Sequence, residues 1–80
     1  MDDSDVLSRI NSLAQEEHDL FQRAAHETLS EAEHQRLREL EVQLDQCWDL
    51  LHQRRARRNA GLDPDDATIR DPDTVEGYVE

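Results

Sequence analysis

Two residues near the middle of the chain have the spacing of a metal-binding motif. Glu31 and His34 lie three positions apart, so on a helix both side chains would share a face. A Glu-x-x-His pair of this kind supplies ligands to the di-iron sites of ferritin-like helix bundles. Glu31 falls in the first turn of a predicted helix, however, and the facing segment offers only Glu17 as an inward carboxylate. A ferritin-like metal-binding oligomer is therefore the least favoured alternative.

Enzymatic chemistry finds little support in the sequence. Cys47 is the only cysteine and occupies a position in the apolar repeat described below, where a thiol behaves as a small apolar side chain. No histidine shares its helical face in the predicted register, and no Ser-His-Asp set, phosphate loop or cysteine-based zinc motif is present. We therefore predict a protein that is not an enzyme and holds no cofactor or metal.

One short segment is strongly basic. Such a cluster could bind nucleic acid or another anion. The whole chain carries a formal net charge of -11, however, and like charge repels phosphate, so nucleic acid is a disfavoured partner. The simpler interpretation is that the cluster offsets the negative end of its helix and pairs with acidic residues at the N-terminus and in the tail. The four candidate anion-binding residues are Arg54, Arg55, Arg57 and Arg58.

Two predicted helices that fold back on each other position these residues. Apolar residues step by three and four along residues 6–20 and again along 37–51. In an antiparallel arrangement the facing residue numbers all add to the same value, as a constant register requires. The sequence therefore predicts an all-α, coiled-coil-like antiparallel two-helix hairpin. Its seam consists of the pairs Val6–Leu51, Ile10–Cys47, Leu13–Leu44, Glu17–Leu40 and Leu20–Leu37.

Local signals indicate where the two helices begin and end. Asp3 or Ser4 can cap a first helix over about 4–25. Ser30 followed by Glu33 fits a capping box, which starts a second helix over about 30–60. Gly61 stands where a left-handed residue commonly ends a helix. We therefore assign residues 1–61 to the hairpin.

Residues 62–80 form a strongly acidic tail. The tail has seven Asp and Glu residues against a single arginine, and Pro64 and Pro72 interrupt any helix. This composition predicts an extended or disordered, mostly irregular segment. Apolar side chains return near the end, where we predict a short recognition segment made of Val75, Tyr78 and Val79.

The two flanks of the predicted hairpin differ in character. The charged flank carries Arg9, Glu16, Arg23, Arg36, Gln43 and Leu50. The other flank carries Leu7, Ala14, Phe21, His34, Glu41 and Trp48, including the only Phe and the only Trp. We call the candidate interface on this flank, Leu7, Phe21, His34 and Trp48, the aromatic edge. An exposed patch of this kind marks an interface, and a two-fold axis would join two copies into a four-helix bundle. Alternatively, the tail folds back and covers the edge with Val75, Tyr78 and Val79.

The second predicted helix resembles a known family. The string Asp-Gln-Cys-Trp-Asp-Leu-Leu at 45–51, the arginine-rich string at 53–58 and the ending at 75–80 are similar to those of small uncharacterised actinobacterial proteins. These proteins form the domain-of-unknown-function family twenty-six thirty, and the resemblance spans nearly the whole chain. The resemblance implies no catalytic residue, because the family has no assigned activity. It suggests that the second helix and the C-terminal string matter together.

These observations favour a non-enzymatic protein–protein interaction or regulatory module, with a second copy or an unknown protein as its partner. The acidic start lacks the apolar core of a signal peptide, and no stretch reaches the roughly 20 apolar residues of a membrane helix. A single cysteine suits a reducing compartment, so we expect a cytoplasmic protein without a membrane partner. The alternatives are an anion binder acting through the arginine cluster and, less favoured, the metal-binding oligomer.

Overall fold

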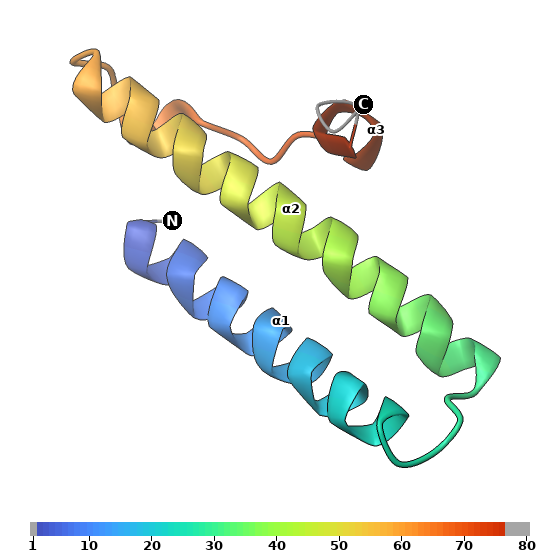
Figure 1. The fold of residues 1–80 in the computed structure, drawn as a ribbon. Helices are drawn as coiled ribbons and strands as arrows, with labels where there is room; N and C mark the ends of the chain where they lie inside the picture. Colours follow the sequence, from blue (N-terminus) through green and yellow to red (C-terminus); the bar gives the residue numbers. More distant parts are fainter. Residues whose placement is uncertain (1, 77–80) are drawn as a thin grey trace.

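The computed structural model describes residues 2–76, which form two long helices and two short ones (Figure 1). Helix α1 spans Asp3–Ala24, and α2 spans Glu31–Asn59. A single 3-10 turn, η1, covers Pro64–Asp66, and α3 covers Pro72–Glu76. The two long helices pack antiparallel, so the predicted all-α hairpin is confirmed. The molecule measures 50 × 27 × 15 Å, and α2 alone accounts for about 44 Å of that length.

Both long helices start at reciprocal capping boxes. The Asp5 backbone N–H donates to the Asp2 carboxylate at 2.9 Å, and the Asp2 N–H donates to the Asp5 carboxylate at 3.1 Å. The cap predicted at residue 3 or 4 was therefore placed too late, because Asp5 completes a box with Asp2 instead. At α2 the predicted box is confirmed: the Glu33 N–H donates to the Ser30 hydroxyl at 3.1 Å, and the Ser30 N–H donates to the Glu33 carboxylate at 2.9 Å.

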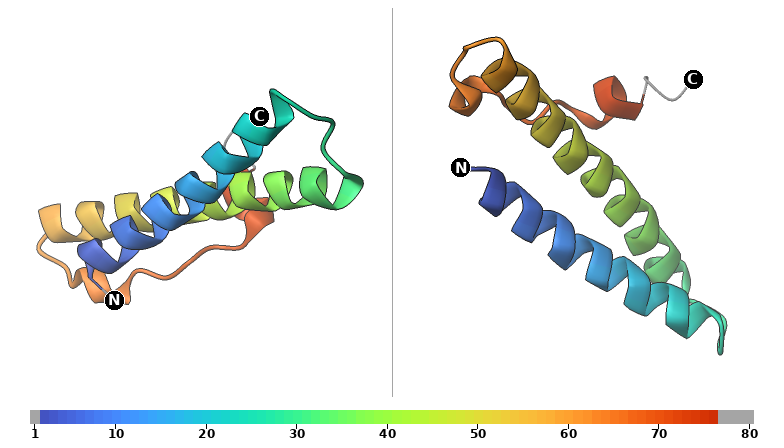
Figure 2. Two further views of the ribbon diagram at one scale, coloured as in Figure 1. Left: turned by 90° about the horizontal axis from the view of Figure 1, so that it is seen from below. Right: turned by 60° about the vertical axis from the view of Figure 1, so that its left-hand side comes forward.

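A Schellman motif ends α2 and reverses the chain. Gly61 has φ +76°, so the left-handed residue predicted there is confirmed. Its N–H donates to the Arg58 carbonyl at 3.1 Å, and the Leu62 N–H donates to the Arg57 carbonyl at 2.8 Å. After this turn the chain runs back along α2, on the side away from α1 (Figures 1 and 2).

Replacing Gly61 by Ala should lower the free energy of unfolding by about 1 kcal/mol, because an L side chain is strained in the left-handed region. No atom lies within 4 Å of the added Cβ, so the cost is purely conformational. Gly61→Asn is the matched control, since Asn tolerates this region better and should lose less. Urea unfolding followed by circular dichroism measures both variants. Equal losses would contradict the backbone explanation.

The core is built mainly from the predicted seam. Seven seam residues are buried: Val6, Ile10, Leu13, Leu20, Leu40, Cys47 and Leu51. Leu37 and Leu44 pack against this cluster while remaining partly exposed, and Glu17 is half-buried. Cys47 therefore acts as a small core residue, as predicted.

One core residue was assigned to the wrong surface by the sequence. Leu50 was placed on the charged flank, but it is buried within the core cluster. Ala67 of the returning tail packs against the same cluster. The core therefore extends beyond the two seam positions per heptad that the apolar repeat of α2 indicates.

The tail is more ordered than predicted. Pro64 and Pro72 begin η1 and α3 instead of interrupting helices, because the first helical turn needs no N–H from proline. The Asp71 carboxylate accepts a hydrogen bond from the Thr74 N–H at 2.8 Å at the start of α3. Val75 is buried, whereas Tyr78 and Val79 lie outside the described residues. Within residues 62–76 the tail thus contains two short helical segments joined by the irregular stretch 67–71.

Candidate functional site

The aromatic edge is exposed on the hairpin. The exposed fractions are 38% for Leu7, 50% for Phe21 and 41% for Trp48. His34 is exposed as well, and the Trp48 ring lies against His52 with centroids 6.4 Å apart. With residues 62–76 docked on α2, Leu7, Phe21 and Trp48 remain exposed. Tyr78 and Val79, which the alternative also places on the edge, lie outside the described residues.

Ion pairs join the two long helices on the charged flank. Arg36 donates from Nε and Nη2 to the two oxygens of Glu16, at 2.5 and 2.9 Å. These bonds lower the pKa of the Glu16 carboxyl. Arg23 forms ion pairs with Glu27, at 3.1 Å, and with Glu33. Glu16 receives the bonds from Arg36 because it lies on the charged flank, whereas Glu17 lies on the seam.

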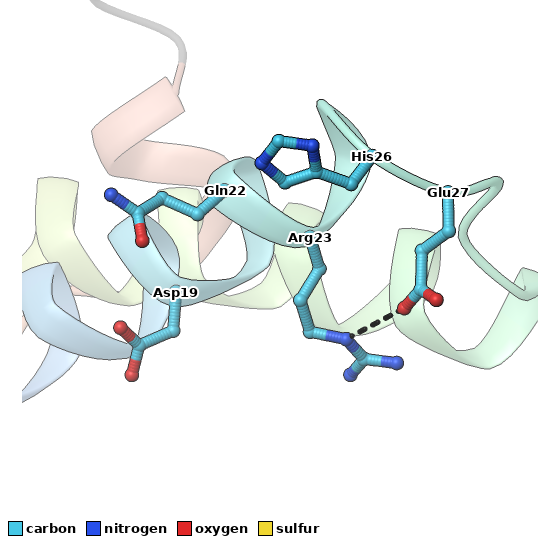
Figure 3. Close-up of a pocket in the computed structure, with 5 residues that line it drawn as sticks. All are labelled: Asp19, Gln22, Arg23, His26 and Glu27. Atoms are coloured by element: carbon cyan, nitrogen blue, oxygen red, sulfur yellow. Dashed lines mark hydrogen bonds and ion pairs between the residues drawn. The ribbon is translucent and has the colours of Figure 1, made fainter.

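A shallow hollow lies at the end of α1 (Figure 3). Its lining residues are Asp19, Gln22, Arg23, His26 and Glu27. All five are exposed, and Arg23 and Glu27 pair with each other across one side of the hollow. Ligand sites usually combine an enclosed apolar pocket with a few oriented polar groups. This hollow has no buried side chain in its lining, so we do not assign it a ligand.

Arg54 joins three parts of the chain. Its side chain is only 5% exposed. Nε donates to Asp3 at 2.7 Å, and Nη1 donates to the Pro64 carbonyl at 3.2 Å and to Asp65 at 2.9 Å. The bond to Asp3 and then the bond to Asp65 raise the pKa of the guanidinium, and the bond from Arg54 lowers the pKa of Asp3. One charged group thus ties the start of α1 to the start of the tail.

The rest of the arginine cluster also faces the tail and the N-terminus. Arg57 donates from Nε to the Asp63 carbonyl at 2.7 Å and reaches Asp66 at 3.4 Å. Arg58 donates to Asp3 at 2.9 Å. The predicted pairing of the cluster with acidic residues of both chain ends is therefore confirmed for Arg54, Arg57 and Arg58. Arg55 is exposed.

A row of polar residues on α2 contacts the returning tail. Gln53 donates to the Thr68 carbonyl at 2.9 Å, and Gln46 donates to the Arg70 carbonyl at 3.0 Å. Arg70 forms an ion pair with Asp49 at 3.0 Å. We call this surface the tail-docking face and define it as Gln46, Asp49, Gln53, Arg54 and Arg57. Sequence reasoning missed the two glutamines, although their seven-residue spacing places them on one face of α2.

α3 places one carboxylate within electrostatic reach of two others. The charges of Asp45 and Glu41 on α2 act on Glu76. Burial, followed by the neighbouring charge of Asp45, raises the pKa of Glu76. Because these charges repel one another near neutral pH, they weaken the attachment of α3 to α2.

The candidate metal ligands lie at the exposed start of α2, where no third ligand joins them among the described residues. Glu31 and His34 are both exposed near the start of α2. Within residues 2–76, no three His, Cys, Asp or Glu side chains gather closely enough to hold a metal ion. In the same part of the chain, neither long helix has an apolar stretch that would cross a bilayer.

Comparison with known proteins gives a consistent match over the whole chain. The profile of a protein of unknown function (DUF2630) matches residues 2–80. The chain is 51% identical over 78 residues to uncharacterized proteins of Mycobacterium bovis and Mycobacterium tuberculosis. Each match covers 96% of this chain and 90% of the relative. No solved structure matches the chain.

Proposed function

The chain belongs to the DUF2630 family of proteins of unknown function, and since membership assigns no activity, we propose a role from the molecular surface. The protein is a non-enzymatic protein–protein interaction module that forms homodimers through the aromatic edge. One observation carries the proposal: Leu7, Phe21 and Trp48 are exposed along one edge while the seam residues are largely buried.

The edge has the dimensions and chemistry of a helix-packing interface. Leu7 and Phe21 lie 14 residues apart on α1, which corresponds to about 21 Å. Trp48 supplies the matching aromatic surface on α2, and tryptophan is enriched among the residues that dominate interface energies. Burying such groups contributes about 25 cal/mol for each Å² removed from water.

A second copy is the partner that this edge fits best. The edge spans both long helices, so a two-fold axis would place the same groups opposite each other and complete a four-helix bundle. Small domains expose much of their apolar surface, and association is a common way to bury it. The anion-binding alternative has weaker support, because Arg54, Arg57 and Arg58 already donate to acceptors of the same chain.

Trp48→Ala should convert a dimer into a monomer, because it removes the largest apolar side chain of the proposed interface. Light scattering coupled to size exclusion at micromolar concentration measures the mass. Leu62→Ala is the matched control, since Leu62 is 53% exposed but lies in the tail, and its mass should equal that of the wild type. A monomeric wild-type protein, or a Trp48→Ala protein that remains a dimer, would contradict the proposal.

A further inference from the structure

The tail-docking face recognises the main chain of an extended segment. Gln46 and Gln53 donate to carbonyls two residues apart, those of Arg70 and Thr68. Arg57 donates to a third carbonyl, that of Asp63. Contacts to the main chain tolerate different side chains. They also favour a peptide over a nucleic acid, whose backbone presents phosphate oxygens instead of amide carbonyls.

The same face also recognises acidic side chains. Arg54 donates to Asp65 at 2.9 Å, and Arg57 reaches Asp66 at 3.4 Å. Arginine is suited to such recognition, because its planar guanidinium offers several donors in a fixed geometry. Arg54 is held in place by its bond to Asp3 of α1, so this donor group is already oriented before a segment docks.

The tail occupies this face through few apolar contacts. Leu62 and Ile69 are 53% and 51% exposed, so two of its larger apolar side chains contribute little. Val75 is buried, and Ala67 packs against the core. Glu76 opposes docking through its proximity to Asp45 and Glu41. Segments held by few buried apolar contacts open at low cost compared with global unfolding.

From these contacts we propose that the tail-docking face is a binding site for an extended acidic peptide of a partner protein. Residues 62–76 occupy the site in cis and act as its built-in competitor. A ligand binds with reduced apparent affinity when the competent state is only fractionally populated. Releasing the tail therefore regulates access to the site. The site is separate from the aromatic edge and does not depend on dimerisation.

The test uses the full chain with a weakened tail. The double variant Asp65→Asn, Asp66→Asn removes the charges that Arg54 and Arg57 contact, and both aspartates are mostly exposed, so the hairpin should remain folded. The probe is a fluorescein-labelled synthetic peptide with the sequence of residues 62–76, followed by fluorescence anisotropy. The variant should bind the probe at least about tenfold more tightly than the wild type.

Matched variants then identify the residues that bind the probe. Adding Gln53→Ala and Arg57→Ala to the double variant should abolish the gain, whereas adding Arg55→Ala or Trp48→Ala should leave it unchanged. Hydrogen exchange at 67–76 reports independently whether the tail has been released. A tail that is released without any gain in probe binding would overturn the proposal. So would a tail that stays protected in the double variant, because it would then be a fixed part of the fold.

Three further results would assign the face to something other than a partner peptide. If a scrambled peptide bound as tightly as the probe, the binding would be explained by general charge attraction. Tighter binding of a single-stranded RNA than of the peptide would make the tail a shield for a nucleic-acid site. Loss of the wild-type dimer mass in the double variant would show that the natural occupant is the tail of a second copy.

Discussion

Leu40→Ala should lower the free energy of unfolding by about 3 kcal/mol, within the range of roughly 2–5 kcal/mol measured for buried leucines in other proteins. Leu40 is 0% exposed and belongs to the core cluster of the seam between α1 and α2. Truncation would leave a cavity that a two-helix core cannot easily refill. A chain of this length has a total stability of roughly 4–12 kcal/mol, so the variant should lose roughly a quarter to three quarters of it and unfold at a clearly lower urea concentration.

Urea unfolding at equal protein concentration measures this loss, because association would otherwise shift the apparent stability. Leu62→Ala removes the same atoms from a side chain that is 53% exposed, and it should change stability by less than about 0.5 kcal/mol. Similar losses for the two variants would mean that the seam does not form the principal core.

Arg54→Ala should lower the thermal midpoint by several degrees and release the tail at the same time. The substitution removes the donor for Asp3, Asp65 and the Pro64 carbonyl together, and it leaves these acceptors without their buried partner. Arg54→Lys should restore little of the lost stability, because an ammonium group cannot reproduce the forked donor geometry of the guanidinium. Calorimetry gives the midpoint, and hydrogen exchange at 67–76 gives the release.

Arg55→Ala is the matched control for this prediction, since it removes the same charge from an exposed neighbouring position.

The dependence of stability on acid pH provides a further measurement. Arg54 lowers the pKa of Asp3, so this contact stabilises the fold above the unfolded-state pKa and is lost as pH falls through the lower folded-state pKa. The Arg54→Ala variant should therefore lose less stability on acidification than the wild type. An unchanged acid profile would mean that Asp3 gains no net stability from Arg54.

The sequence predicted the hairpin because the seam is a local, periodic property. Leucine, isoleucine and valine at three- and four-residue steps specify both helices and their register without information from elsewhere. The capping box at Ser30 and the left-handed Gly61 are similarly local signals, and both are confirmed. The boundaries of the long helices therefore follow closely from the sequence.

The sequence did not predict the tail-docking face, because that face depends on residues that are far apart in the chain. The burial of Arg54 needs both Asp3 and the turn that starts at Pro64. Gln46 and Gln53 gain their role only when the carbonyls of the tail lie beside them. In the apolar repeat of α2, Gln46 and Gln53 occupy ordinary polar positions. The charge balance indicated that the cluster and the tail attract each other, but it did not specify the contacts.

The position of α2 between two antiparallel neighbours limits how the length of this chain can change during evolution. One residue inserted within 37–57 would rotate everything beyond it by about 100°. That rotation would misalign the seam with α1 and the tail-docking face with the tail in a single step. We therefore expect insertions and deletions among relatives to concentrate in the exposed turn at 25–28 and at the tail end. The middle of α2 should change only by substitution, and each substitution must be compatible with both the seam and the tail-docking face.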